Sequence, residues 1–479
     1  MFKLNDVSAH EDSTLQKSDE KITLPKMIKR HMREYLLGAF VVLAMGSLLF
    51  WGISTQFPNR YNDVTRYQCY GNVFWKGSPG LASLPADQCA FLSASSSTSL
   101  IQKMKARGFP ASIVRLVEAQ STTQPFHALP PEYPLLTILP DTLGLLAPEQ
   151  WYQVAFALWM ALIAGAIYFV LKRYRSTSAA IAFAIYLVIG NWATAEGRFD
   201  LIPSGLTLGA VILAGRVKWK WAYSLLALAT LFKFYSVILI VPFLIAQQMQ
   251  SNRKWNSWHR WSALGVFLAI CLGVTLVSLL LNVASTLSPL SYFVNRPTEI
   301  ESLQASLLWL GHFVGYPTKE VFTYQSLNML SPLSSKLSLL DTLCLGAGLL
   351  YTFWLQWRGK LDIYWASLLT LLIVVITGKV FSPQYLMWVT PLVAYIGKSN
   401  WKWLVSWGGV GALTTFIFPY MFDHYVVDKY YPVIVVRNGL IVIIVLALLY
   451  HVARTPRTNG LQYAAVSSEA SNSSKNKGE

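Results

Sequence analysis

The sequence predicts an all-α polytopic membrane protein, a bundle of about twelve transmembrane helices whose first outer loop carries juxtamembrane helices. Composition is the first observation behind this prediction. Of 479 residues, 54% are hydrophobic and 13% are charged, and the mean hydropathy is +0.41. Soluble domains carry about 25% charged residues. The second observation is that apolar runs near the length of a membrane span, about 20 residues, recur along the chain.

Most of the expected spans are runs without charge, or nearly so. They occupy residues 36–55, 151–171, 177–195, 201–214, 261–284, 342–356, 363–377, 385–397, 403–420 and 432–450. Segment 221–248 is different. As one helix it would place Lys233 in mid-membrane and send the basic connector 253–260 outside, and both outcomes are unfavourable. Two short helices turning at Lys233 avoid both, and they put each end of the chain in the cytoplasm.

The net charge of +16 comes from basic residues in short connectors. This is the positive-inside pattern of membrane proteins rather than a surface for nucleic acid. These residues are Lys26, Lys29, Arg30, Arg33, Lys172, Arg173, Arg175, Arg216, Lys218, Lys220, Arg253, Lys254, Arg260, Arg358, Lys360, Lys398, Lys402, Arg454 and Arg457.

The chain divides into three parts. Residues 1–34 are polar and do not resemble a cleavable signal peptide, so they are expected to be a disordered cytoplasmic segment before an anchor helix. Residues 35–455 form the transmembrane domain, in which 55–150 is a large extracytoplasmic loop. Residues 456–479 have the composition of a disordered cytoplasmic tail.

The first loop contains three local features. An amphipathic stretch, Pro110–Ala119, is expected either to lie on the membrane surface or to pack over the bundle. The apolar stretch 135–146 follows a Pro-rich break and is a candidate re-entrant segment. Cys69 and Cys89 both fall in this loop, where they are able to pair.

The outer connectors collect the unusual polar residues. The positive-inside rule explains the basic residues of the cytoplasmic connectors, but it does not explain polar residues in the outer connectors. These outer residues indicate an active site on one face of the protein. The outer set is Asp63, Glu196, Arg198, Asp200, Lys233, Arg296, Glu299, Glu301, Lys379, Ser382, Gln384, Asp423 and His424.

Asp63 is the candidate general base. It lies about ten residues past the first span, in the motif Arg60-Tyr61-Asn62-Asp63-Val64-Thr65-Arg66-Tyr67. A carboxylate held beside cations, at the depth of lipid head groups, suits chemistry on a lipid-linked substrate.

Four cations are expected to bind an anionic lipid head: Arg198, Lys233, Lys379 and Arg437. For Lys233, snorkelling to the interface is the alternative. Six further residues are candidate substrate contacts: Arg66, Glu196, Asp200, Arg296, Glu301 and Gln384.

Several outer residues also have simpler interpretations. Asp200 would serve equally as the N-cap of the following helix. On a helix, Glu299 and Glu301 would point to different faces, one as a surface charge and the other holding Arg296. His312 and His424 are expected to be structural.

Some function classes are excluded by missing motifs. The sequence has no phosphate-binding G-x-x-x-x-G-K-[ST] loop, no G-x-G-x-x-G after a strand and no Asp-x-Asp pair. The cluster Gly408-Gly409-Val410-Gly411 indicates helix packing. A transferase without a nucleotide-binding domain must use a donor dissolved in the membrane. No cofactor is expected, and a divalent metal is not indicated.

Taken in order, these motifs resemble the bacterial glycosyltransferase family 87, polytopic enzymes of the C superfamily that include polyprenol-phosphate-mannose-dependent mannosyltransferases. The resemblance covers roughly residues 35–455. Its most specific motifs are Ile300-Glu301-Ser302-Leu303-Gln304-Ala305-Ser306 and Phe381-Ser382-Pro383-Gln384-Tyr385-Leu386. The chain departs from the family pattern at Arg198, where Gln is more usual, and at Ser236, where Pro is more usual.

The resemblance implies an inverting hexosyltransferase of the cell membrane. Its donor would be a polyprenyl-phosphate sugar, such as mannose or a related hexose or pentose, and its acceptor a hydroxyl of a glycolipid or glycan on the extracytoplasmic face. Asp63 would deprotonate that hydroxyl while cations stabilise the departing phosphate. The main alternatives are a transporter or a flippase of lipid-linked sugars.

Overall fold

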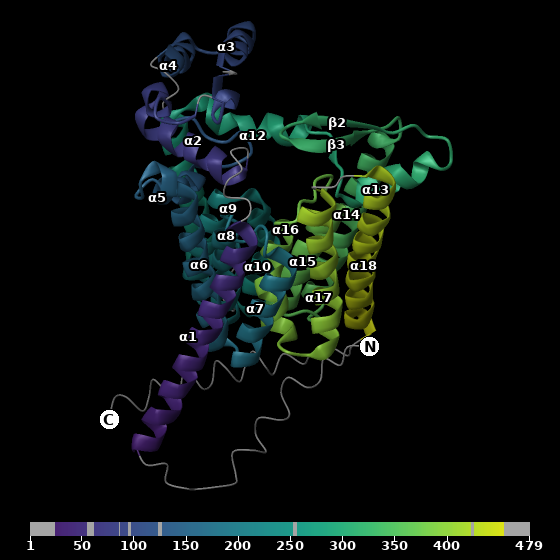
Figure 1. Ribbon diagram of the computed structural model, residues 1–479. Helices are drawn as coiled ribbons and strands as arrows, with labels where there is room; N and C mark the ends of the chain where they lie inside the picture. The colour runs from purple at the N-terminus through teal and green to yellow at the C-terminus, as the bar shows by residue number, and fades with distance from the viewer. Residues whose placement is uncertain are drawn as a thin grey trace.

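The computed structural model describes residues 24–54, 62–85, 87–93, 97–122, 127–251, 256–422 and 426–454 (Figure 1). Most of these residues form a helical bundle. Its helices are α1 (Leu24–Ser54), α6 (Tyr152–Tyr174), α7 (Thr177–Asn191), α8 (Leu201–Gly215), α9 (Trp219–Phe232), η6 (Phe234–Leu239) with α10 (Ile240–Gln250), α11 (Trp258–Leu281), α14 (Ser334–Trp357), α15 (Ile363–Thr377), α16 (Tyr385–Gly397), α17 (Trp401–Thr415) with η7 (Phe416–Met421), and α18 (Val427–Arg454).

Six helical segments among the described residues are long and apolar enough to cross a membrane. They are Tyr35–Ser54, Glu149–Tyr174, Trp258–Leu281, Ser334–Trp357, Trp401–Met421 and Lys429–Arg454. The chain is therefore a largely helical membrane protein, as its composition predicts. The predicted disordered N-terminal segment is wrong for residues 24–34, which belong to α1. The rest of that segment, and the tail 456–479, lie outside the described residues.

The shorter apolar helices lie deep in the bundle. Helices α15 and α16 have 15 and 13 residues, and most of their residues are buried. At 1.5 Å per residue such a helix rises about 20 Å, less than the hydrocarbon core of about 30 Å. Irregular backbone at the ends of such helices is tolerated where protein, not lipid, surrounds it.

The predicted break at Lys233 is confirmed. Helix α9 ends at Phe232, Lys233 has extended backbone (φ −156°, ψ 125°), and the 3-10 helix η6 begins at Phe234. The chain therefore reverses direction at Lys233. A single continuous helix would instead have placed the Lys233 charge in the middle of a membrane span.

The remaining elements gather at one end of the bundle, the upper end in Figure 1. They are α2 (Asp63–Lys76), η2 (Ser78–Leu81), η3 (Ala90–Ser93), α3 (Ser97–Ala106), α4 (Ala111–Thr122), η4 (Leu135–Thr137), α5 (Ile138–Gly144), η5 (Glu149–Trp151), α12 (Val283–Asn295), α13 (Leu303–His312) and the strands. Because α6 starts beside this cap and runs down, Lys172 and Arg173 in its last turn lie at the opposite end.

The amphipathic stretch expected at 110–119 forms α4, which packs on the junction of α11 and α12. The buried side chain of Val117 joins a cluster with Met104 and Val283. The amide of Gln120 donates to the carbonyls of Leu279 and Leu280 at 3.0 and 2.9 Å. The packing alternative therefore holds for this face of the helix.

A small antiparallel sheet departs from the all-α prediction. Its strands are β1 (Thr298–Glu299), β2 (Lys319–Thr323) and β3 (Ser326–Leu330), in the order β1-β3-β2. Thr298 pairs with Met329, and Val321 pairs with Asn328. The helical pattern assumed for residues 299–301 is accordingly wrong.

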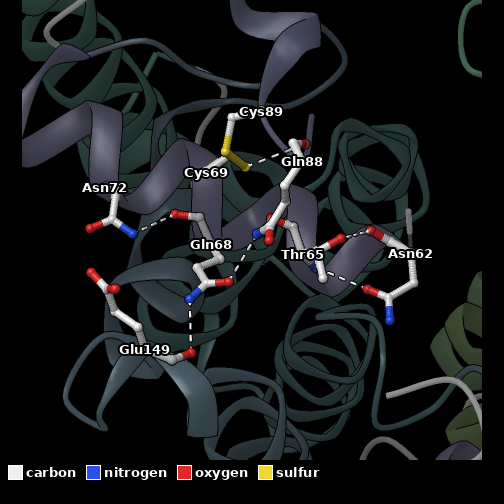
Figure 2. Close-up of a disulfide and its surroundings, with 8 residues drawn as sticks. All are labelled: Asn62, Thr65, Gln68, Cys69, Asn72, Gln88, Cys89 and Glu149. Carbon is white, nitrogen blue, oxygen red and sulfur yellow. Dashed lines mark hydrogen bonds between the residues drawn. A yellow bond between two sulfur atoms is a disulfide. The ribbon is translucent and has the colours of Figure 1, made fainter. Parts of the chain in front are cut away.

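Cys69 of α2 and Cys89 form a disulfide (Figure 2). Gln88 next to the bond donates to the side chain of Gln68 at 3.0 Å, and Gln68 donates to the carbonyl of Glu149 at 3.0 Å. The disulfide and the side-chain amides of Gln68 and Gln88 therefore connect the loop after α2 with Glu149, just before α6.

Within the glycine cluster, Gly411 serves helix packing, as the sequence indicates, whereas a Cβ at Gly408 would meet nothing within 4 Å. A Cβ at Gly190 of α7 would lie 2.9 Å from the Cα of Gly411 in α17. That distance is too short for two carbons, so only glycine lets these two backbones meet.

We expect Cys69→Ser with Cys89→Ser to lower the thermal stability of the purified protein. The bond closes a loop across a sequence separation of 20 residues, and such a closure stabilises by about 3 kcal/mol. Thermal melting in detergent measures the change. Cys271→Ser with Cys344→Ser is the control, because both are free cysteines. Equal melting of the two double variants would contradict the prediction.

Candidate functional site

Asp63 is held by the start of α2. The side chain of Asn62 caps this helix by accepting from the amide of Thr65 at 2.9 Å. Its amide group donates to Gln153 of α6 at 3.1 Å. The cap therefore fixes both the first turn of α2 and its position on the bundle, and Asp63 with it.

Two arginines bind the Asp63 carboxylate. Arg66, one turn later, pairs with Oδ1 at 2.9 Å, and Arg198 pairs with Oδ2. Burial alone would raise the pKa of Asp63, but the charges and hydrogen bonds of both arginines outweigh it and hold this pKa below its usual range. The group is thus a carboxylate at neutral pH, with 17% of its side chain exposed.

Glu132 extends this network. Its Oε1 lies 3.5 Å from Arg66. Its Oε2 is buried and makes no hydrogen bond within the described part of the chain. Sequence reasoning missed this residue, although Pro130-Pro131-Glu132-Tyr133-Pro134 places a carboxylate in the same loop as Asp63.

A buried ion pair lies two residues from Arg198. Lys233 donates to Oδ1 of Asp200 at 2.6 Å, and the indole of Trp388 in α16 donates to the same oxygen at 2.5 Å. Asp200 stands at the start of α8 but makes no side-chain cap bond there. The N-cap interpretation of its carboxylate is therefore wrong, and the ion pair takes its place.

Aromatic rings enclose the Lys233 ammonium. Four ring centroids lie 5.1–5.6 Å from its Nζ, and they belong to Tyr133, Phe199, Tyr385 and Trp388. This geometry provides cation–π stabilisation to a desolvated charge. It also contradicts snorkelling, because 9% of the side chain is exposed.

Phe199 joins the two halves of the site. It lies between Arg198 and Asp200 in the chain, and its ring contacts Tyr67 and Tyr133 at centroid distances of 5.5 and 4.9 Å. We call the six charged side chains around it the central cluster. Its members are Asp63, Arg66, Glu132, Arg198, Asp200 and Lys233. Three acids and three cations make it close to neutral.

Two predicted residues form a separate site. Arg296 and Lys379 line a cavity of about 140 Å³ together with Thr298 and the start of α14. The charges of both Arg296 and Asp200 act on the hydroxyl of Tyr385, so the cavity and the central cluster are within electrostatic range of the same side chain.

The predicted phosphate-binding role of Arg437 is wrong. It was expected to contact a donor phosphate, but it is fully buried in α18. Its guanidinium binds the Glu301 carboxylate at 2.7 Å and the Glu301 carbonyl at 2.5 Å. Glu301 was expected to contact substrate, and it too is buried in this pair. Neither side chain is accessible to a ligand. The prediction that Glu299 or Glu301 binds Arg296 is also wrong for Glu301, because Glu301 binds Arg437 instead.

The other predicted positions are more scattered. Gln384 is buried one turn before Trp388 and accepts from Ser382 at 2.6 Å. Glu196 is fully buried, and its carboxylate makes no hydrogen bond among the described residues. His312 is exposed at the end of α13. Asp423 and His424 lie outside the described residues.

A second missed carboxyl is Asp141 in α5. It is fully buried, and neither carboxyl oxygen makes a hydrogen bond in the described ranges. Burial raises its pKa well above the usual range. A lone Asp in an apolar stretch is the signal that would have singled it out.

Within the described residues, no three His, Cys, Asp or Glu side chains group so as to hold a metal ion. No protein-family model matches the chain, and no curated protein matches it significantly.

We expect Arg437→Leu to destabilise the protein by about 3–5 kcal/mol, because it leaves the Glu301 charge buried without a partner. Arg437→Leu with Glu301→Leu should recover much of the loss. Thermal melting of both variants measures this. Normal stability of Arg437→Leu together with lost ligand binding would instead favour the original phosphate role.

Glu196 should make stability depend on pH. Burial raises its folded-state pKa to about 8, from an ordinary 4.5. Between these values the unfolded chain releases its proton first, so the free energy of unfolding falls as pH rises. We expect Glu196→Gln to raise the melting temperature more at pH 8 than at pH 5. An equal change at both pH values would contradict the shifted titration.

Proposed function

We propose that the chain is an integral membrane glycosyltransferase that moves a sugar from a polyprenyl-phosphate donor to an acceptor hydroxyl. The observation that carries the proposal is the Asp63 carboxylate, held by Arg198 and Arg66 next to the Lys233–Asp200 pair. The resemblance of the motifs to glycosyltransferase family 87 supports the same reaction class.

The proposed topology places the central cluster on the extracytoplasmic side. The Cys69–Cys89 disulfide lies in the same loop as Asp63, and disulfides persist in oxidising compartments. Basic residues such as Lys172 and Arg173 lie at the opposite end, where the positive-inside rule expects the cytoplasm. Under this proposal the six long segments and six shorter bundle helices make twelve spans of a C-superfamily fold.

The chemistry assigns Asp63 as the general base. The acceptor oxygen attacks the anomeric carbon, the bond to the phosphate oxygen breaks, and the acceptor proton passes to Asp63. A single displacement of this kind inverts the anomeric centre. The leaving phosphate departs as an anion, so it needs positive charge more than a proton.

Arg198 couples these events. It pairs with Asp63, and the negative charge that develops on the leaving phosphate would compete for the same guanidinium. Release of Asp63 from one of its two cations raises its pKa and strengthens it as a base. The carboxylate thus becomes more basic as the bond to the phosphate breaks.

We expect Asp63→Asn to lose about 10²–10⁴-fold of the transfer rate, the usual contribution of a general base. Donor binding should remain, because the cations of this face are unchanged. Membranes carrying each variant would be supplied with a panel of labelled polyprenyl-phosphate sugars, and products would be analysed by chromatography.

Glu118→Gln is the matched control, since it changes an acid to its amide in the same loop, paired with Lys105 on α3. Full transfer by Asp63→Asn would reject the base assignment. Donor translocation across vesicles without any transfer by the wild type would instead favour a flippase.

A further inference from the structure

Positive charge without a counter-ion gathers at one place beside the central cluster. In the described part of the chain, neither Arg296 nor Lys379 makes an ion pair. Arg296 donates to the hydroxyls of Tyr292 and Ser326 at 3.2 and 2.9 Å, and Lys379 donates to the carbonyl of Val294 at 3.1 Å. Both cations are thus hydrogen-bonded to neutral groups.

Among the described residues, Glu299 makes no ion pair with either cation. Burial and the neighbouring Glu301 raise the pKa of Glu299 well above its usual range, and its Oε2 accepts from the backbone amides of Glu301 and Phe381, each at 3.3 Å. Burial and the charge of Arg296 together lower the pKa of Lys379. The two cations therefore repel each other across a shared space, and an anion between them would relieve that repulsion.

The other buried cations of this face, unlike Arg296 and Lys379, do have carboxylate partners among the residues that the structure describes. In the central cluster, Arg198 and Lys233 each have a carboxylate partner. Arg437 is neutralised by Glu301. An anionic ligand gains most from cations that it does not have to take from an existing partner.

Hydroxyl-bearing residues line the cavity together with the two cations: Thr298, Ser334, Ser335 and Ser338. The hydroxyl of Thr298 already donates to Gln304 at 2.9 Å, which leaves the three serines as hydroxyl donors for a ligand. The serines belong to the first turns of α14, a 24-residue helix whose positive dipole end favours anions. The Nε of Arg296 is buried without a hydrogen bond among the described residues. A volume of about 140 Å³ equals that of about five waters, enough for one phosphoryl group.

Electrostatic interactions connect the cavity with the central cluster. Glu132 is close enough for its charge to act on both Arg296 and Lys233. The Tyr385 ring lies 5.6 Å from the Lys233 Nζ and feels the charge of Arg296. A phosphoryl group in the cavity would therefore lie within electrostatic range of the central cluster.

We propose that the Arg296–Lys379 cavity is the phosphoryl-binding subsite of this protein. Its use in turnover rests on the proposed function, whereas binding itself does not. The ligand is the phosphate of a lipid-linked compound or a soluble phosphate, both recognised by the same cations and hydroxyls. This assignment moves the phosphate away from Arg437 and makes Arg198 and Lys233 secondary to the cavity.

The test is binding of inorganic phosphate and of dodecyl phosphate to the full-length protein in uncharged detergent, measured by calorimetry. We expect Arg296→Gln with Lys379→Gln to weaken binding at least about tenfold, roughly 1.4 kcal/mol. Arg296→Lys with Lys379→Arg should keep most of it. Lys319→Gln, an exposed cation on β2 of the same sheet, is the charge-matched control and should bind as the wild type does.

The two probes identify the source of the phosphate. Tighter binding of dodecyl phosphate, lost in the glutamine double variant, assigns a lipid-linked phosphate. Binding of inorganic phosphate alone, lost in the same variant, assigns a soluble one. If the double variant does not fold, Lys379→Gln alone, at a half-exposed position, should still weaken binding of both probes.

Unchanged binding by the glutamine variants overturns the subsite, even if sugar transfer is found. Asp63→Asn should bind both probes normally. Loss of binding in the glutamine variants, with no transfer from any donor by the wild type, rejects the proposed function and leaves the subsite standing.

Discussion

The buried pair of Lys233 and Asp200 is the interaction on which the upper end of the bundle depends. It joins the break after α9 to the start of α8, and Trp388 joins α16 to the same carboxylate at 2.5 Å. A charge pair taken out of water is costly unless further hydrogen bonds and aromatic faces compensate. Here an indole N–H and four rings surround it, so three helix ends are held in one arrangement.

The central cluster follows from this constraint. Only Phe199 lies between Arg198 and Asp200 in the chain. The ion pair that fixes the position of Asp200 therefore also fixes the position of Arg198, which binds Asp63. The disulfide and the Asn62 cap hold α2 from the other side. The Asp63 carboxylate is thereby positioned by rigid elements rather than by a free loop. Under the proposed function, this lowers the cost of reaching a reactive geometry.

Charge is distributed unevenly over this face. The central cluster is balanced, the Arg437–Glu301 pair is balanced, and the Arg296–Lys379 cavity is not. Balanced buried charges stabilise one arrangement of the helices. Unbalanced ones cost stability in the free protein and are compensated when an anion binds, which is the pattern expected of a ligand subsite.

Periodicity and charge alone predict the helical membrane class, the break at Lys233 and most helix positions. The reason is local: apolar runs, a charge that cannot stay in mid-span and a glycine cluster each act within a few turns of helix. The presence of Asp63, Arg198, Lys233 and Lys379 on one face also follows from the order of the connectors.

Only the tertiary structure decides which of these charges are partners. Arg437 and Glu301 are 136 residues apart, and nothing local distinguishes their buried pair from an open phosphate contact. Glu132, Trp388 and the strand containing Glu299 acquire their roles from neighbours far along the chain. Pairing of charges depends on distances across the fold, and sequence spacing does not contain them.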